Sequence, residues 1–283
     1  MLQIDPSILA NIKSFDWAIK SLANGAYHGT RFSRKLGPGI EFSQYRPYSQ
    51  GDDLRQLDWK MYARSEKYFI KQSQIETNVN ITFLIDTSNS MTYEEDGWSK
   101  LNYAKLLTGV LCHLSMDHGD SINISTSQDH VHGQNKRHWS RILYVLSELQ
   151  PTDRFETPVI DPSRGKELFV IISDLYEQNK EWSDFISGLK SPKNEVIVFH
   201  LTGEKEHDLS FGSNVTFQDL ETNAKLQLDA PSIQAQYQES FREWISSTKD
   251  HFTSKGVDFF PFRINENLSE AINRFTHHRK MLA

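Results

Sequence analysis

The sequence has a single cysteine and no long apolar run. Cys112 is the one cysteine among 283 residues, so the chain cannot form an internal disulfide bond. No stretch approaches the roughly 20 consecutive apolar residues that cross a bilayer as a helix. The N-terminal stretch MLQIDPSILANIKSFDW carries acids and a proline where a signal peptide has a basic start and an apolar core. We therefore expect a cytoplasmic protein that does not insert directly into a membrane.

The chain also lacks an excess of positive charge. It contains 31 Lys and Arg against 37 Asp and Glu, for a formal net charge of −6. This balance argues against a general nucleic-acid or anionic-membrane surface. The length permits one large α/β domain with additions. We expect an N-terminal extension over residues 1–75 that packs on a main domain over residues 76–283.

The stretch FLIDTSNSM, from Phe83 to Met91, is the most informative part of the sequence. A β-branched and aromatic run before it predicts a buried parallel strand that ends at Asp86. Asp86, Ser88 and Ser90 stand two residues apart, and apolar spacing predicts a helix from about 99 to 117. The three oxygen-bearing side chains therefore lie at a strand-to-helix turn, where open α/β sheets bind ligands.

The chemistry of these side chains suits a hard divalent cation. One carboxylate and two hydroxyls supply the oxygen ligands that Mg²⁺ or Mn²⁺ prefers. Asp174 ends a second predicted buried strand, and neighbouring parallel strands bring their carboxyl ends to the same edge of a sheet. A fifth ligand is expected from the loop before that strand, where Thr152 and Thr157 are the candidates and Thr152 is our choice. The alternative is that these side chains only cap the helices that follow.

Strand-like and helical patterns alternate along the main domain. Predicted strands at 79–85, 121–124, 168–174, 195–201 and 257–262 are separated by predicted helices at 99–117, 139–149, 179–189 and 231–254. This alternation predicts a Rossmann-like α/β fold, with a mostly parallel sheet flanked by helices. A β-hairpin with a polar tip is expected to be inserted at about 215–229. Before the sheet, apolar spacing predicts a helix over 7–24 that stops near Asn24 and Gly25.

Several other polar groups are interpreted as structural. Acids and arginines between Asp52 and Arg64 form either a partner-binding surface or an internal ion-pair lattice, and we favour the lattice because aromatic residues are interleaved with them. His130 and His132 would share one face of a strand, but without a third ligand nearby we expect a solvated edge and no zinc. His277 and His278, beside two arginines, are assigned to the solvent-facing side of the last helix.

Two segments resemble known families. The order DTSNSM, a loop threonine and an Asp at the end of a later strand resembles the metal-ion-dependent adhesion site of von Willebrand factor A domains. The upstream segment GPGIEFSQYRPYSQGDDLRQLDWKMYAR is similar to the domain-of-unknown-function 58 family, as is the tail from DLETNAKLQLD to HHRKM. The resemblance covers about Gly37 to Arg279. It implies a von Willebrand factor A-type fold and the metal ligands Asp86, Ser88, Ser90, Thr152 and Asp174, although PTDRFET lacks the usual glycine-rich lead.

The resemblance also implies a function. Members of the family often accompany MoxR-type AAA+ ATPases, so we expect a binding module that works as an adaptor in assembling or remodelling a protein complex. The partner, the ATPase or its client, would supply an Asp or Glu to the metal. The enzymatic alternative is a haloacid-dehalogenase-like phosphatase, but its acid–base step needs a carboxylate where Ser88 stands. A structural scaffold with an empty metal site is the third hypothesis.

Overall fold

The structure is a computed structural model that describes residues 5–29, 41–49, 57–74, 79–126, 130–134, 138–152, 160, 166–176, 181–220, 222–264 and 266–282. The chain divides into two compact units. We call Met1–Thr30 together with Asn78–Ala283 the sheet unit, and Arg31–Thr77 the small unit. The first 30 residues therefore cluster with the sheet, whereas the predicted packing of the whole extension on the main domain stays a prediction.

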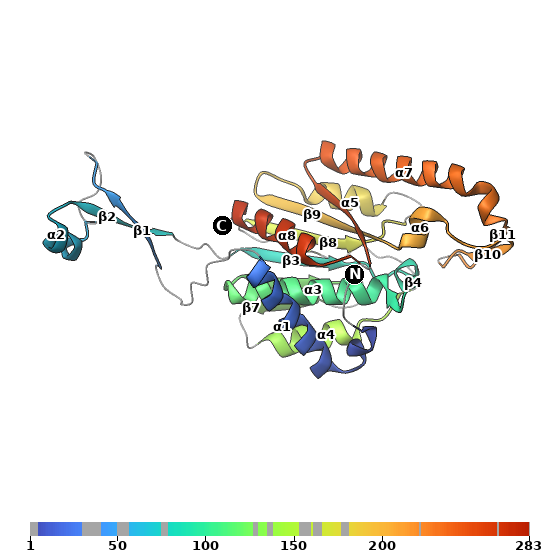
Figure 1. Cartoon of the computed structure of the whole chain (residues 1–283), viewed down its shortest axis with the longest axis horizontal. Coiled ribbons are helices and arrows are strands. Elements are labelled where there is room, and N and C mark those ends of the chain that lie inside the picture. Colours follow the sequence, from blue (N-terminus) through green and yellow to red (C-terminus); the bar gives the residue numbers. More distant parts are fainter. Residues whose placement is uncertain are drawn as a thin grey trace. The chain divides into compact units, whose positions relative to one another are not determined.

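A six-stranded sheet forms the centre of the sheet unit (Figure 1). Its strand order is β12-β9-β8-β3-β6-β7. The strands are β3 (Asn80–Ile85), β6 (Ser121–Ser125), β7 (His130–Gln134), β8 (Glu167–Ser173), β9 (Asn194–Thr202) and β12 (Asp258–Arg263). Five strands are parallel, and β7 pairs antiparallel with β6 at one edge. The predicted α/β fold with a central parallel sheet is confirmed.

Helices cover both faces of this sheet. The first face packs against α3 (Lys100–Asp117), α4 (Trp139–Glu148) and α8 (Ser269–Leu282), and the second against α5 (Glu181–Leu189) and α7 (Ala230–Ser254) (Figure 1). Phe83 lies in the first core and its neighbour Leu84 in the second, because successive side chains of a strand point to opposite faces. Burial on both faces explains the unbroken apolar runs of these strands.

The N-terminal helix differs from its predicted bounds. A short 3₁₀ helix, η1 (Pro6–Ala10), ends at Asn11, whose extended backbone breaks the helical path. The α-helix α1 then runs over Ile12–Gly29, so the predicted stop near Asn24 and Gly25 is wrong. Phe15 and Ile19 are fully buried in the first core, where Ile19 packs closely on Gly109 of α3. The burial of these side chains stabilises α1 by more than the roughly 1 kcal/mol that Gly25 costs inside the helix, so the helix continues past it.

Several short elements lie around the carboxyl ends of the strands. A two-residue ladder joins β4 (Glu94–Glu95) to β5 (Trp98–Ser99), and its turn residues Asp96 and Gly97 both have positive φ, which suits a tight hairpin turn. The short helix α6 (Glu204–Asp208) follows β9. After it, β10 (Val215–Gln218) pairs antiparallel with β11 (Lys225–Leu228).

The small unit has its own antiparallel pair. Its elements are β1 (Glu41–Pro47), α2 (Trp59–Ser65) and β2 (Phe69–Gln74), and β1 pairs with β2. Asp58 caps α2 by accepting the backbone N–H groups of Lys60 and Met61. The rings of Tyr62 and Tyr68 stack at 4.6 Å. Asp52, Asp53 and Arg55, central to the predicted ion-pair lattice, lie outside the described residues.

The end of the chain corrects one assignment. His278 is buried and its Nε2 lies 2.8 Å from Asp258 Oδ2, so its predicted exposure is wrong, whereas His277 is exposed. Arg279 is also buried and forms a bidentate ion pair with Asp120. Both side chains point inward because α8 packs against the sheet through this side.

Across the described residues, no helix combines the length and apolar character needed to cross a membrane.

Candidate functional site

The two predicted acids follow adjacent strands of the sheet. Asp86 comes directly after β3 and Asp174 directly after β8, and these strands pair in parallel. The backbone N–H of Asp86 donates to the carbonyl of Ile172 at 3.0 Å, which continues the pairing to the strand end. Since β3 also neighbours β6, the strand order reverses at β3, and the carboxyl end of the β3–β8 crevice is the topological switch point.

The loop after β3 curls so that its hydroxyls approach both acids. The backbone N–H of Ser88 donates to Asp86 Oδ1 at 2.9 Å. Ser88 Oγ lies 3.0 Å from Ser90 Oγ, and Ser90 Oγ donates to Asp174 Oδ1 at 3.0 Å. All four side chains are buried. The structure thus brings Asp86, Ser88, Ser90 and Asp174 into one hydrogen-bonded cluster, which we call the strand-end site.

Thr152 lies beside the loop that carries the serines. It forms a parallel bridge with Ser88, and its backbone N–H donates to the carbonyl of Thr87 at 2.6 Å. Its hydroxyl lies 3.0 Å from the Thr87 hydroxyl. The other candidate, Thr157, lies outside the described residues. The segment after α4 therefore borders the strand-end site, whereas Thr152 as a fifth ligand stays a prediction.

A serine that the sequence interpretation missed supports Asp86. Ser173, the last residue of β8, donates its hydroxyl to Asp86 Oδ2 at 2.5 Å and accepts the N–H of Leu175. Burial and the nearby charge of Asp174 raise the pKa of Asp86 to about 6, although the bonds from Ser173 and Ser88 oppose the shift. The available signal was a serine at the end of an otherwise apolar strand. The buried carboxylates of Asp86 and Asp174 therefore repel each other when both are ionised.

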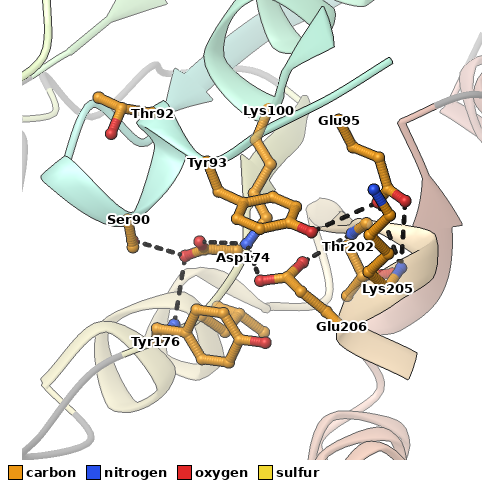
Figure 2. A network of polar contacts seen from close by, with 12 residues as sticks. Ser90, Thr92, Tyr93, Glu95, Lys100, Asp174, Tyr176, Thr202, Lys205 and Glu206 are labelled. Atoms are coloured by element: carbon orange, nitrogen blue, oxygen red, sulfur yellow. Dashed lines mark hydrogen bonds and ion pairs between the residues drawn. The ribbon is translucent and has the colours of Figure 1, made fainter. Parts of the chain in front are cut away.

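A buried lysine, also missed, neutralises part of that charge. Lys100 is the first residue of α3, and its Nζ lies 2.9 Å from Asp174 Oδ2 and 2.7 Å from Glu206 Oε1 (Figure 2). Burial lowers the pKa of Lys100, but attraction to Asp174 and Glu206 outweighs it, so the net pKa is raised. A lysine in the first turn of a helix opposes the helix dipole, which is the signal that could have drawn attention to it.

Polar contacts extend from Lys100 to α6 and α7. Glu206 Oε2 accepts the N–H of Gly203 at 2.6 Å, and the carbonyl of Glu206 accepts the Tyr237 hydroxyl of α7 at 2.8 Å. Glu95 accepts the N–H of Lys205 at the start of α6 (Figure 2). A Cβ at Gly203 would lie 2.4 Å from Tyr93 Cε1 and 2.6 Å from Glu95 Oε2. Glycine therefore permits the close approach of α6 to β4 that completes this network.

The donor atoms of the strand-end site are hydroxyl and carboxylate oxygens. Within the described residues, no group of three or more His, Cys, Asp or Glu side chains is arranged to hold a metal ion. A cation at the strand-end site would therefore take serine hydroxyls among its ligands. Such a donor set favours hard cations over softer ones that prefer nitrogen or sulfur.

Comparison with protein families identifies a match over most of the chain. The model of the family described as "Protein of unknown function DUF58" matches residues 44–246. Uncharacterized proteins of Mycobacterium tuberculosis and Mycobacterium bovis are each 22% identical over 236 residues, which cover 77% of this chain and 72% of the relative.

Two solved structures have a limited similarity to the chain. One is the conserved hypothetical protein BatB from Bacteroides thetaiotaomicron, with a TM-score of 0.45 and 13% identity. The other is an aerotolerance-related membrane protein from Bacteroides fragilis, with a TM-score of 0.43 and 15% identity. Each alignment covers 72% of this chain and 100% of the other.

Proposed function

The chain belongs to the DUF58 family, and we propose that its strand-end site binds Mg²⁺ or Mn²⁺ and, through that ion, a carboxylate of a partner protein. The observation that carries this proposal is the meeting of Asp86, Ser88, Ser90 and Asp174 at the carboxyl ends of two adjacent strands. Their order in the sequence and their hydroxyl-rich chemistry resemble the metal-ion-dependent adhesion site of von Willebrand factor A domains.

The spacing of the oxygens supports an octahedral cation. Mg²⁺ holds its ligands at about 2.1 Å, so neighbouring oxygens of its octahedron are about 3 Å apart. Ser88 Oγ and Ser90 Oγ are 3.0 Å apart, as are Ser90 Oγ and Asp174 Oδ1. These residues would hold the ion, and Asp86 would supply a carboxylate. Thr152 is proposed to complete the set from the neighbouring segment.

The electrostatics of the strand-end site also favour a cation. Burial raises the pKa of Asp86 because it removes water from the charged carboxylate. The charge of Asp174 raises it further, because two carboxylates repel each other where water does not screen them. A divalent ion would offset both the repulsion and the desolvation of these acids. Since the hydroxyl ligands carry no charge, only the acids of the site would offset the charge of the ion, and an open coordination position on the ion would accept a carboxylate from outside.

We further propose that the partner is a MoxR-type AAA+ ATPase or its client. This partner class follows from the resemblance to the family, and the metal chemistry adds that the partner contributes an Asp or Glu. On this view the chain is an adaptor in complex assembly or remodelling and performs no chemistry itself.

Metal binding is tested by titrating the purified full chain with Mg²⁺ in a calorimeter. Wild type should bind one equivalent, and Asp86→Ala should show no binding heat while keeping its circular dichroism spectrum. Asp184→Ala, which removes an exposed acid on α5, is the matched control and should bind like wild type. Undiminished binding by Asp86→Ala would show that the ion does not bind at the strand-end site.

Partner binding is tested by capturing a purified MoxR-type ATPase on the immobilised chain. Capture should require Mg²⁺, should be lost in EDTA and should be lost in Ser88→Ala. The control is Ser187→Ala, because the Ser187 hydroxyl bonds within α5 to the Ser183 carbonyl. Capture that is insensitive to both EDTA and Ser88→Ala would place the interface away from the metal.

A further inference from the structure

Lys100 occupies a position that is unfavourable for a lysine unless its charge is used. It begins α3, where the helix dipole repels a cation, and its side chain is fully buried. Burying an ammonium group carries a large desolvation penalty. The two carboxylates at 2.9 Å and 2.7 Å compensate for this cost. The ammonium nitrogen also lies 4.6 Å from the centre of the Tyr176 ring and 5.2 Å from the centre of the Tyr93 ring (Figure 2).

The two oxygens of Asp174 have different partners. Oδ1 accepts the Ser90 hydroxyl and so faces the strand-end site, whereas Oδ2 accepts the Lys100 ammonium. Because both groups are buried among aromatic rings, water screens the charge of Lys100 poorly. Lys100 therefore acts electrostatically on the same acid that we propose helps to hold the metal ion.

We propose that Lys100 is a fixed counter-cation that weakens divalent-cation binding at the strand-end site. This inference rests on the proposed metal-binding function. The formal charges of Asp86, Asp174 and Glu206 sum to −3, and the formal charge of Lys100 reduces this sum to −2. Removing the ammonium would leave −3 at the same place. Because the partner's carboxylate would itself ligate the ion, metal and partner would bind cooperatively, and a weaker intrinsic metal affinity makes occupancy of the site depend more on the partner.

The two partners of this ion pair should change metal affinity in opposite directions. Lys100→Met keeps an unbranched side chain of similar length but removes the positive charge, so it should tighten Mg²⁺ binding. Glu206→Gln removes a negative charge and leaves Lys100 with Asp174 alone, so it should weaken Mg²⁺ binding. A purely structural role would make both variants bind more weakly, because both would disturb the same network.

The experiment measures Mg²⁺ affinity of the full chain by calorimetry at pH 8, which is above the pKa of Asp86. Lys100→Met should bind about tenfold more tightly than wild type, and Glu206→Gln several-fold more weakly. The control is Lys105→Met, a buried lysine of the same helix whose charge interacts with Glu148, and its affinity should match wild type. Circular dichroism establishes that each variant is folded, and Lys100→Arg, which keeps the charge, should bind Mg²⁺ like wild type.

The outcomes separate this inference from the proposed function. If wild type and Lys100→Met bind Mg²⁺ equally well, the metal site stands and the role of Lys100 is overturned. If wild type binds no Mg²⁺ but Lys100→Met does, the role of Lys100 stands and the proposed metal-dependent function fails. If neither binds Mg²⁺, both are overturned. Should Lys100→Met not fold, unchanged or tighter binding by Glu206→Gln would overturn the inference.

Discussion

Ser90 and Asp174 are 84 residues apart in the chain, yet the hydroxyl of Ser90 donates to Asp174 Oδ1 at 3.0 Å. The contact joins the loop after β3 to the end of β8. The serine of the DTSNSM segment therefore faces an acid supplied by a different part of the sequence. A substitution of Ser90 should therefore alter the position of the Asp174 side chain, and a substitution of Asp174 should alter the position of the Ser90 side chain.

Asp86 should make the metal-free protein less stable as pH rises. Its pKa is about 6 when folded against an ordinary 3.8, so between these values the folded chain binds more protons than the unfolded chain. As pH rises from 4 to 6, the folded chain has to release this proton, and the free energy of unfolding decreases. Above pH 6 the total decrease is about 3 kcal/mol. Asp86→Asn, which cannot ionise, should be as stable as wild type near pH 4 and more stable at pH 7.

The measurement is thermal melting of both proteins in EDTA at several pH values. His200 has a pKa lowered to about 4 by burial and acts in the opposite direction, but it is present in both proteins and cancels in the difference. Asp184→Asn, at an exposed acid, is the control. A difference between Asp86→Asn and wild type that does not change with pH would contradict the expected ionisation of Asp86.

The purified chain should not hydrolyse phosphoesters, nucleotides or peptides in the presence of Mg²⁺. Ser88 stands where a phosphatase would have its second acid, and a serine hydroxyl is a poor general acid or base near pH 7. Ser90 donates to Asp174 Oδ1, but the other oxygen of that carboxylate is already paired with the ammonium of Lys100. Release of para-nitrophenol or inorganic phosphate measures the activity. Metal-dependent turnover that is absent from Asp86→Asn would establish an enzyme instead of a binding module.

Breaking the ion pair of Arg279 with Asp120 should destabilise the chain strongly. Asp120 is fully buried, and its carboxylate also accepts the N–H of Val79. Arg279→Met would leave that buried carboxylate without a cation and should lower the free energy of unfolding by about 3 to 5 kcal/mol. For a unit of this size the melting temperature should fall by roughly 10 °C.

The matched control for this prediction lies on the same helix. Arg274 pairs with Glu270 at 2.7 Å, but both side chains are exposed, and such pairs contribute about 0 to 1 kcal/mol. Arg274→Met should therefore shift the melting temperature only slightly. Equal shifts for the two variants would show that burial does not set the strength of the Arg279 pair.

Helix α1 should stabilise the sheet unit through one face only. Phe15 is fully buried in the first core, so Phe15→Ala should cost about 3 to 5 kcal/mol in the free energy of unfolding. Trp17, two residues on, is 67% exposed, and Trp17→Ala should change stability by about 0.5 kcal/mol or less. Urea unfolding measures both. A small effect of Phe15→Ala would mean that α1 is not an integral part of the folded unit.

Sequence patterns were most informative where the structure depends on neighbouring residues. The apolar runs that became β3 and β8 have a length and composition typical of strands buried on both faces. Asp86, Ser88 and Ser90 follow one such run within a few residues, so their proximity is a local matter. Asp174 needed one further rule, that parallel strands end at a common edge, and the pairing of β3 with β8 satisfies it.

The stop of α1 shows where local patterns mislead. Asn24 and Gly25 are typical helix terminators, but the helix continues to Gly29. The same limit applies to α8, where the pattern assigned His278 to solvent although it contacts Asp258. Which face of a helix is buried depends on the elements that pack against it, and a helical repeat alone does not identify them.

The sequence by itself determined the five parallel strands of the sheet, most of the helices and the oxygen-rich loop, because these follow from short-range patterns of apolar and polar residues. Only the tertiary structure decided that Ser173 contacts Asp86 and that Lys100 joins Asp174 to Glu206. Lys100 is 74 residues from Asp174 and 106 from Glu206. Contacts at such separations arise when packed elements bring distant charges together, and burial then requires each charge to find a partner.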